Sequence, residues 1–255
     1  MSAFDTTAPA FDRHRVLPDG VAEAIREAIL DAVGVPAPRL LDLGAGTGRI
    51  GWPFVAAGDD YVGVDLSLGM LRAFVQRGSP RVVQADGQSL PFRDAAFDAV
   101  MLIQVFGGMR GWRRVLAEAR RVLRSTGALV VGRTVAPAAG IDEQMKQRLA
   151  TILDEMGVQR ERVNARDDAL RLLEETASGA RIDAAAWNAE RTPRGFLDRH
   201  PTGARFAALP EAAKDAALRR LGAWAAAAFG SLDIAFSEPH RFELHVFRFQ
   251  QGASR

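Results

Sequence analysis

The chain has 255 residues, of which 48% are hydrophobic and 25% are charged, a composition typical of globular proteins. It contains no cysteine, which excludes disulfides, thiolate metal sites and a thiolate nucleophile. Lys and Arg total 33 and Asp and Glu total 31, so the formal charge of +2 predicts no nucleic-acid partner. The N-terminal segment lacks the apolar core of a signal peptide, and no apolar run is long enough to span a membrane. We therefore expect a cytoplasmic protein without a membrane partner.

The first half of the chain alternates between short apolar runs and helical stretches. A helix is predicted over residues 18–34, with Asp19 as its N-cap and Gly34 at its end. The strands predicted after it lie at residues 39–43, 60–64, 81–85, 97–103 and 127–134. The helices predicted between these strands lie at residues 48–57, 67–77 and 112–123. This alternation favours a parallel sheet with helices on both faces, in which the crossover after the third strand is short or irregular.

The second half is mainly helical and ends in a strand. Helices are predicted at residues 138–157, 165–178, 192–201 and 210–229, the third of them capped by Thr192. Residues 180–191 are a weak strand candidate. Residues 240–250 alternate apolar and polar side chains, which predicts a half-exposed strand at the sheet edge with His245 facing solvent.

A glycine-rich turn follows the first predicted strand, in the sequence RLLDLGAGTGRI. Gly44, Gly46 and Gly48 follow the pattern G-x-G-x-G, and Arg49 occupies the place of the third glycine of a dinucleotide fingerprint. No lysine follows, as a phosphate-binding P-loop would require. Asp42 precedes the turn, and its carboxylate opposes a pyrophosphate but suits a cation such as an ammonium or a sulfonium.

Two further acids follow the next predicted strands. Asp65 ends the second strand, where a carboxylate can accept two ribose hydroxyls. Asp86 follows the third strand, and the Asp86–Gly87 step suggests a turn that could read an adenine edge. These residues suit a ligand that has a ribose, an adenine and a cationic group but no pyrophosphate. S-adenosylmethionine is such a ligand.

Four segments together resemble the class I S-adenosylmethionine-dependent methyltransferases, of the small-molecule, methyltransferase type 11/25-like kind. They are LDLGAGTGRI, VGVDLSLGML, QADGQSLPFRDAAFDAVMLIQVF and VLAEARRVLRSTGALVV, and the resemblance spans about residues 38–135. It implies an α/β, Rossmann-like fold with a seven-stranded, mostly parallel sheet, an antiparallel edge strand and a helical lid insertion. It also implies S-adenosyl-L-methionine as methyl donor, S-adenosyl-L-homocysteine as product, and no metal.

We expect one domain over residues 1–255, with the later helices as an insertion rather than a separate domain. Its predicted parts are an N-terminal arm and helix (1–36), a cofactor-binding core (37–135), a helical lid with one strand (136–231) and a C-terminal strand (232–255). The arm FDRHR resembles a segment that folds over the cofactor in many family members.

The resemblance assigns a cofactor role to one set of residues: Asp42, Gly44, Ala45, Gly46, Gly48, Asp65, Leu66, Met70, Asp86, Gly87 and Gln104. The glycine turn would pass under the methionine part, Asp42 would lie near its amino group, and Gln104 beside its amino-acid portion. Asp65 would bind the ribose, Leu66 and Met70 would flank the adenine, and Asp86 and Gly87 would read its edge. Simpler alternatives are a helix cap for Asp65, an Asx-turn for Asp86, a core position for Met70 and a strand-end polar group for Gln104.

The methyl acceptor is expected to be a small molecule whose identity the sequence does not give. The residues predicted to line its pocket are Phe11, Arg15, Phe106, Arg133 and Arg194, and the arginines Arg133 and Arg194 favour an anionic acceptor. Many relatives have a histidine after the fourth strand, but this chain has Gly107 and Gly108 there, so no general base is named. Catalysis by alignment and proximity is the interpretation that remains.

Two other functions stay open. One is a catalytically silent protein that binds S-adenosylmethionine or its product as a regulator. The other is an NAD(P)-dependent oxidoreductase, which Arg49 disfavours. The chain is expected to be a monomer or a homodimer.

Overall fold

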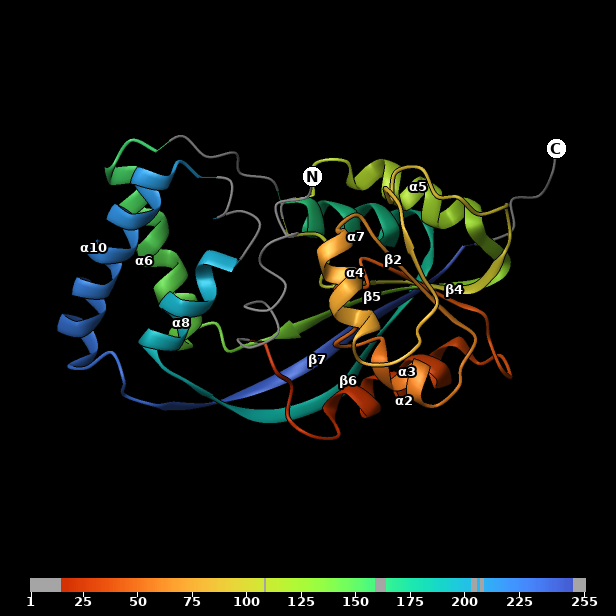
Figure 1. Cartoon of the computed structure of the whole chain (residues 1–255), viewed down its shortest axis with the longest axis horizontal. Helices are drawn as coiled ribbons and strands as arrows, with labels where there is room; N and C mark the ends of the chain where they lie inside the picture. Colours follow the sequence, from red (N-terminus) through yellow and green to blue (C-terminus); the bar gives the residue numbers. More distant parts are fainter. Residues whose placement is uncertain (1–14, 108, 159–163, 203–205, 207–208, 250–255) are drawn as a thin grey trace.

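The protein is built on one seven-stranded sheet, seen in a computed structural model that describes residues 15–107, 109–158, 164–202, 206 and 209–249 (Figure 1). The strand order is β3-β2-β1-β4-β5-β7-β6. Strands β1 to β5 pair in parallel, whereas β7 is antiparallel to both of its neighbours. The strands are β1 (Leu40–Leu43), β2 (Tyr61–Asp65), β3 (Val82–Gln84), β4 (Phe97–Ile103), β5 (Leu123–Val135), β6 (Ser178–Arg191) and β7 (Phe236–Arg248). The predicted α/β, Rossmann-like class of fold is confirmed.

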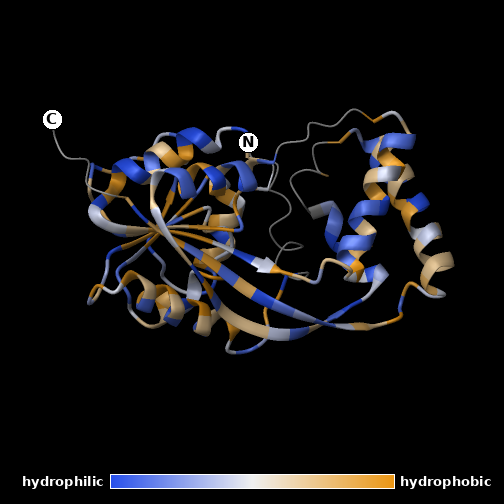
Figure 2. Cartoon of the chain, turned by 180° about the vertical axis from the view of Figure 1, so that it is seen from behind, coloured by the Kyte–Doolittle hydropathy of each residue, from blue (hydrophilic) through white to orange (hydrophobic). Residues whose placement is uncertain are grey.

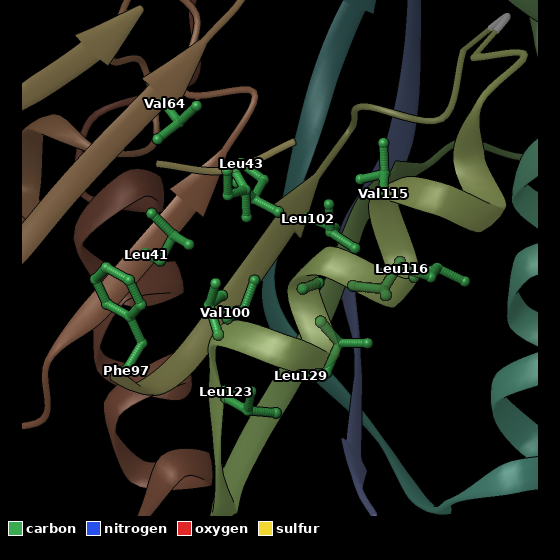
Figure 3. Packing of buried hydrophobic residues seen from close by; sticks show 14 of the residues in the cluster. Leu41, Leu43, Val64, Phe97, Val100, Leu102, Val115, Leu116, Leu123 and Leu129 are labelled. Atoms are coloured by element: carbon green, nitrogen blue, oxygen red, sulfur yellow. The ribbon is translucent and has the colours of Figure 1, made fainter. Parts of the chain in front are cut away.

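Helices cover both faces of the sheet. On one face pack α2 (Val21–Val33), α3 (Trp52–Ala56) and α4 (Leu68–Val75), with side chains such as Ile25, Phe54 and Phe74 fully buried. On the other face pack α5 (Trp112–Val122) and α7 (Ala165–Thr176). Figure 3 shows this second core, where Val115 and Leu116 of α5 lie over the apolar side chains of the central strands. No helix separates β3 from β4, as predicted for that crossover.

A second group of helices stands at one end of the molecule, in the region predicted to be a lid, and we call its members the lid helices. It contains α6 (Ile141–Glu155), α8 (Pro193–Arg199), the 3-10 turn His200–Thr202 and α10 (Glu211–Phe229), which share a separate apolar cluster. Figures 1 and 2 show these helices beside the sheet, with β6 and β7 running out toward them. These helices therefore come from two segments of the chain, one before α7 and one between β6 and β7.

Three local expectations were wrong. Asp19 does not cap α2, because the N-cap is Gly20 and no side chain bonds there. The strand predicted at residues 127–134 begins earlier, at Leu123, and a register shift against β4 absorbs the extra residues. The last strand does not lie at the edge, because β6 covers it, and His245 is only 16% exposed in its side chain.

Two other local predictions are confirmed. Thr192 caps α8, as predicted, by accepting a hydrogen bond from Gly195 N. The weak strand candidate at residues 180–191 forms most of β6. Within the part of the chain that the structure describes, no helix is both long enough and apolar enough to cross a bilayer.

Candidate cofactor site

The loop between β1 and α3 carries the three glycines, each with a positive φ angle. Side chains are rarely tolerated in this conformation. A Cβ on Gly44 would lie 2.3 Å from Val105 Cγ1, and one on Gly48 would lie 2.1 Å from the Phe74 ring. At Gly46 the atom nearest to such a Cβ, among the described residues, is the Gly44 carbonyl oxygen at 3.9 Å. Gly44 and Gly48 thus serve loop packing, whereas a Cβ on Gly46 would make only an ordinary van der Waals contact with the described residues.

Asp42 lies on β1 with its carboxylate buried. The Tyr61 hydroxyl donates a hydrogen bond to Asp42 Oδ2 at 2.7 Å, but Asp42 Oδ1 is buried without a partner among the residues that the structure describes. Burial raises the pKa of Asp42 to about 7; the Tyr61 hydrogen bond opposes the rise and the charge of Asp65 adds to it. A buried carboxylate oxygen without a donor is costly, so this position favours a cation or an N–H donor nearby.

Asp65 is fixed beside the glycine loop at the end of β2. Its Oδ2 accepts a hydrogen bond from Gly46 N at 2.9 Å, and its Oδ1 accepts one from Ser67 N at 2.8 Å. The helix cap of α4 is Ser67, whose hydroxyl accepts from Met70 N. Asp65 is therefore not the cap, and its carboxylate is oriented by the backbone of the glycine loop and of Ser67.

Gln104 extends this edge beyond β4. It has a left-handed backbone with φ 57°, a conformation that costs about 1–3 kcal/mol and often marks functional sites. Its side-chain amide donates to Thr134 Oγ1 at 2.8 Å and accepts a hydrogen bond from Arg49. Arg49 also donates to the carbonyl oxygen of Arg15 at 3.0 Å. Sequence reasoning treated Arg49 only as a departure from another motif and missed this linking role.

The residues predicted around the adenine differ in exposure and in their contacts. Leu66 is exposed at 57%, as a ligand-facing side chain can be, whereas Met70 is buried at 4%. Asp86 Oδ1 accepts a hydrogen bond from Gln88 N at 2.8 Å, which is the Asx-turn given as the simpler alternative. Gly87 lies in the same turn, where a Cβ would only touch Val115 at 3.5 Å.

The predicted acceptor residues that the structure describes have other partners or lie in the core. Phe106 is buried in the core beneath α5. Arg133 donates to the Glu243 carboxylate at 3.0 Å, and the exposed Arg194 pairs with Asp233. Arg15 is held at the glycine loop through its carbonyl oxygen, as described above, and Phe11 lies outside the described residues.

Residues Asp42, Gly46, Asp65 and Gln104 therefore gather along the strand ends, and their chemistry fits S-adenosylmethionine. The two acids suit an ammonium and ribose hydroxyls, and Asp65 is held against the Gly46 backbone by a hydrogen bond from Gly46 N. Within the described ranges, no group of three or more His, Asp or Glu side chains is arranged to hold a metal ion.

Comparison with known proteins agrees with this fold. The methyltransferase-domain family model matches residues 41–131. The demethylmenaquinone methyltransferase of Mycolicibacterium gilvum is 33% identical over 198 residues, covering 73% of this chain and 85% of that protein. The enzyme of the same name from Renibacterium salmoninarum is 39% identical over 141 residues, covering 54% and 59%. The matches to several other curated relatives also cover only about half of the relative's length. For the relative from Paenarthrobacter aurescens this share is 52%.

Among solved structures, the YcgJ protein of Bacillus subtilis superimposes with a TM-score of 0.57. It is 18% identical, and the match covers 90% of this chain and 99% of that one, which supports a shared fold. Taken with the Mycolicibacterium match, these results show that the chain belongs to the class I S-adenosylmethionine-dependent methyltransferase family.

Proposed function

We propose that this protein transfers a methyl group from S-adenosylmethionine to a small-molecule acceptor. The observation that carries the proposal is Asp42 Oδ1, a buried carboxylate oxygen that lacks a donor among the described residues, beside a glycine loop unsuited to phosphate. The cofactor supplies a methyl group that is already activated by a sulfonium sulfur. The protein's part is to bind, orient and exclude water.

Each residue has a distinct part in this proposal. Asp42 receives the ammonium group of the methionine portion, and Gln104 lies beside its carboxylate. Asp65, oriented by Gly46 N, accepts the ribose hydroxyls. Leu66 covers one face of the adenine. Such alignment in a water-poor site can supply most of the acceleration that an activated donor still needs.

We place the acceptor between the strand ends and the lid helices α6, α8 and α10. The charges of Arg133 and Arg194 are matched by Glu243 and Asp233, so they no longer support an anionic acceptor. The curated relatives are named for demethylmenaquinone, which makes its quinol one compound to include in an acceptor screen.

Calorimetry with S-adenosylmethionine, S-adenosylhomocysteine and NADH tests the cofactor. We expect both adenosyl compounds to bind and NADH not to bind. Asp65→Asn should weaken adenosyl binding at least tenfold, about 1.4 kcal/mol, while the control Asp94→Asn, at a side chain 78% exposed, should leave it unchanged. Absence of adenosyl binding to the wild type would refute the proposal.

Release of S-adenosylhomocysteine across a panel of small acceptors then tests the transfer itself. Tight adenosyl binding without turnover on any acceptor would favour the regulatory alternative instead.

A further inference from the structure

The segment between β3 and β4 contains the predicted adenine turn and is bonded to helix α5. The turn begins at Asp86, whose side chain is exposed, and Ser89 N closes it by donating to the carbonyl oxygen of Asp86 at 2.9 Å. The chain that leads into the turn lies beside the ribose acid, because Ala85 N donates to the carbonyl oxygen of Asp65 at 3.2 Å. The turn therefore adjoins Asp65, and its carboxylate is accessible from solvent.

Leu90, the residue directly after the turn, is bonded to α5 through both of its backbone polar groups. Leu90 N donates to Glu118 Oε2 at 2.7 Å, and the Leu90 carbonyl oxygen accepts from Arg121 Nη2 at 3.1 Å. The Leu90 side chain is 6% exposed and packs in the same apolar cluster as α5. These contacts fix the point at which the chain leaves the turn.

Arg121 makes five hydrogen bonds, as many as its guanidinium has N–H groups. Two go to Glu118, from Nε at 2.7 Å and from Nη2 at 2.8 Å. Two more go to backbone carbonyl oxygens of the segment, those of Leu90 and of Phe92, the latter at 2.7 Å. The fifth goes to Asp94, whose side chain is 78% exposed, so that ion pair contributes little.

The pair of Glu118 and Arg121 stays charged at neutral pH. The hydrogen bond from Arg121 lowers the pKa of Glu118 to about 2; burial opposes this change, and the hydrogen bond from Leu90 N adds to it. The same hydrogen bond to Glu118 raises the pKa of Arg121. A two-pronged contact between a guanidinium and a carboxylate is geometrically specific, and a lysine ammonium cannot reproduce it.

A second set of contacts orients the Asp86 carboxylate. Gln88 N donates to Asp86 Oδ1 at 2.8 Å, and Gln88 Nε2 lies 3.4 Å from each carboxylate oxygen. A Cβ on Gly111, the residue before α5, would lie 2.2 Å from Gln88 Oε1, so the start of α5 leaves room for this side chain. Among the described residues, Asp86 Oδ2 has only the long contact to Gln88, so it can accept a further hydrogen bond.

The polar groups of the turn are complementary to one purine edge. Adenine presents an amine at C6, which can donate to Asp86 Oδ2, and a bare N1, which can accept from Gly87 N. Hypoxanthine has a carbonyl at C6 and a hydrogen on N1, so both groups are reversed. Discrimination between the two bases requires Asp86 and Gly87 to be held together at hydrogen-bond distance from that edge.

We propose that Glu118 and Arg121 are positioning residues that hold the turn of residues 86–89 against α5 and thereby set the base selectivity of the cofactor site; this rests on the proposed function. Their effect reaches the ligand through the backbone of Leu90. Without them the turn can shift along α5, where Val115 (Figure 3) lies next to Gly87. Asp86 and Gly87 then lose their common alignment with the base.

Calorimetry with S-adenosylhomocysteine and S-inosylhomocysteine, its hypoxanthine analogue, tests the assignment. We expect the wild type to prefer the adenine ligand about tenfold or more, because the analogue sets like groups against like. Arg121→Lys keeps the charge but loses the fork, and Glu118→Gln loses the charge and one of the accepting oxygens. Each variant should bind the adenine ligand more weakly and reduce the preference to about threefold or less.

Arg26→Lys is the matched control for the loss of an ion pair. Arg26 of α2 makes two hydrogen bonds to Asp59, at 2.7 and 2.9 Å, on the opposite face of the sheet. The control should keep the preference within about twofold of the wild type. Urea unfolding establishes that each variant is folded and measures its stability. A purely structural role for Arg121 would lower stability in Arg121→Lys but leave the ratio of the two affinities unchanged.

An unchanged ratio in both Arg121→Lys and Glu118→Gln would overturn the proposal, as would equal binding of the two ligands by the wild type. Glu118 and Arg121 would then only support the crossover between β3 and β4. These results differ from a failure of the proposed function. A wild type that binds neither ligand refutes the cofactor assignment and this inference with it, whereas tight S-adenosylhomocysteine binding with unchanged ratios refutes the positioning role alone.

Discussion

The buried carboxyl of Asp42 makes a specific prediction about stability and pH. Its pKa rises from the unfolded value of 3.8 to about 7 in the folded protein, mainly through burial. The folded chain therefore binds the proton more tightly than the unfolded chain. Stability from this group is greatest below pH 3.8 and decreases as the pH rises toward 7.

The size of the effect follows from these two pKa values. Between pH 5 and pH 8 the folded protein should lose about 2–3 kcal/mol of unfolding free energy through Asp42 alone. Asp42→Asn removes the ionisation, and its amide oxygen can still accept the Tyr61 hydrogen bond. We expect the variant to be more stable than the wild type at pH 8 and to lose that advantage at pH 5.

Urea unfolding at both pH values, for both proteins, measures the difference directly. S-adenosylhomocysteine should stabilise the wild type more than Asp42→Asn at pH 8, because its ammonium group compensates the carboxylate that the variant lacks. An Asp42→Asn protein with the same pH slope as the wild type would refute this account of the carboxyl.

Two further substitutions test the same region. Tyr61→Phe removes the donor to Asp42 Oδ2 and should cost about 1–3 kcal/mol at pH 8, with a smaller loss at pH 5, in the same urea assay. Gly48→Ala places a Cβ 2.1 Å from the Phe74 ring at a φ of 78° and should cost more than about 2 kcal/mol of unfolding free energy. Gly58→Ala is its matched control, because φ is 79° there with nothing described within 4 Å, so only a backbone cost of about 1 kcal/mol is expected. Equal losses in the two alanine variants would contradict the packing argument.

The parallel half of the sheet could be predicted because its signals are local. Each apolar run from residue 39 onward is followed by a polar or glycine-rich turn, and β1, β2 and β4 begin and end within about a residue of the predicted bounds. The loop glycines and Asp65 could be selected for the same reason. Their backbone conformation and their position at a strand end depend on neighbours a few residues away.

The hydrogen-bond partners of the site residues could not be predicted from the sequence, because they come from segments far apart in the chain. Arg49 reaches Gln104, 55 residues away, and Asp42 bonds Tyr61, 19 residues away. A sequence pattern gives the face of a strand on which a side chain lies, but not which side chain meets it from another strand. That is why Asp42 could be predicted at the site while its buried, half-satisfied state could not.

The last strand shows this limit most clearly. Its alternation places Phe242 and Leu244 on one face and Glu243 and His245 on the other, but the predicted strand began at residue 240 and left out Glu238 of the observed β7. Alternation alone could not tell which face meets α6 and Trp187 and which meets Arg133, because β6 and the lid helices decide that. Without those layers the strand was predicted to be half-exposed at the sheet edge, with His245 facing solvent. Strand β6 and the lid helices instead bury both faces, so that Glu238, His240 and Glu243 are all buried.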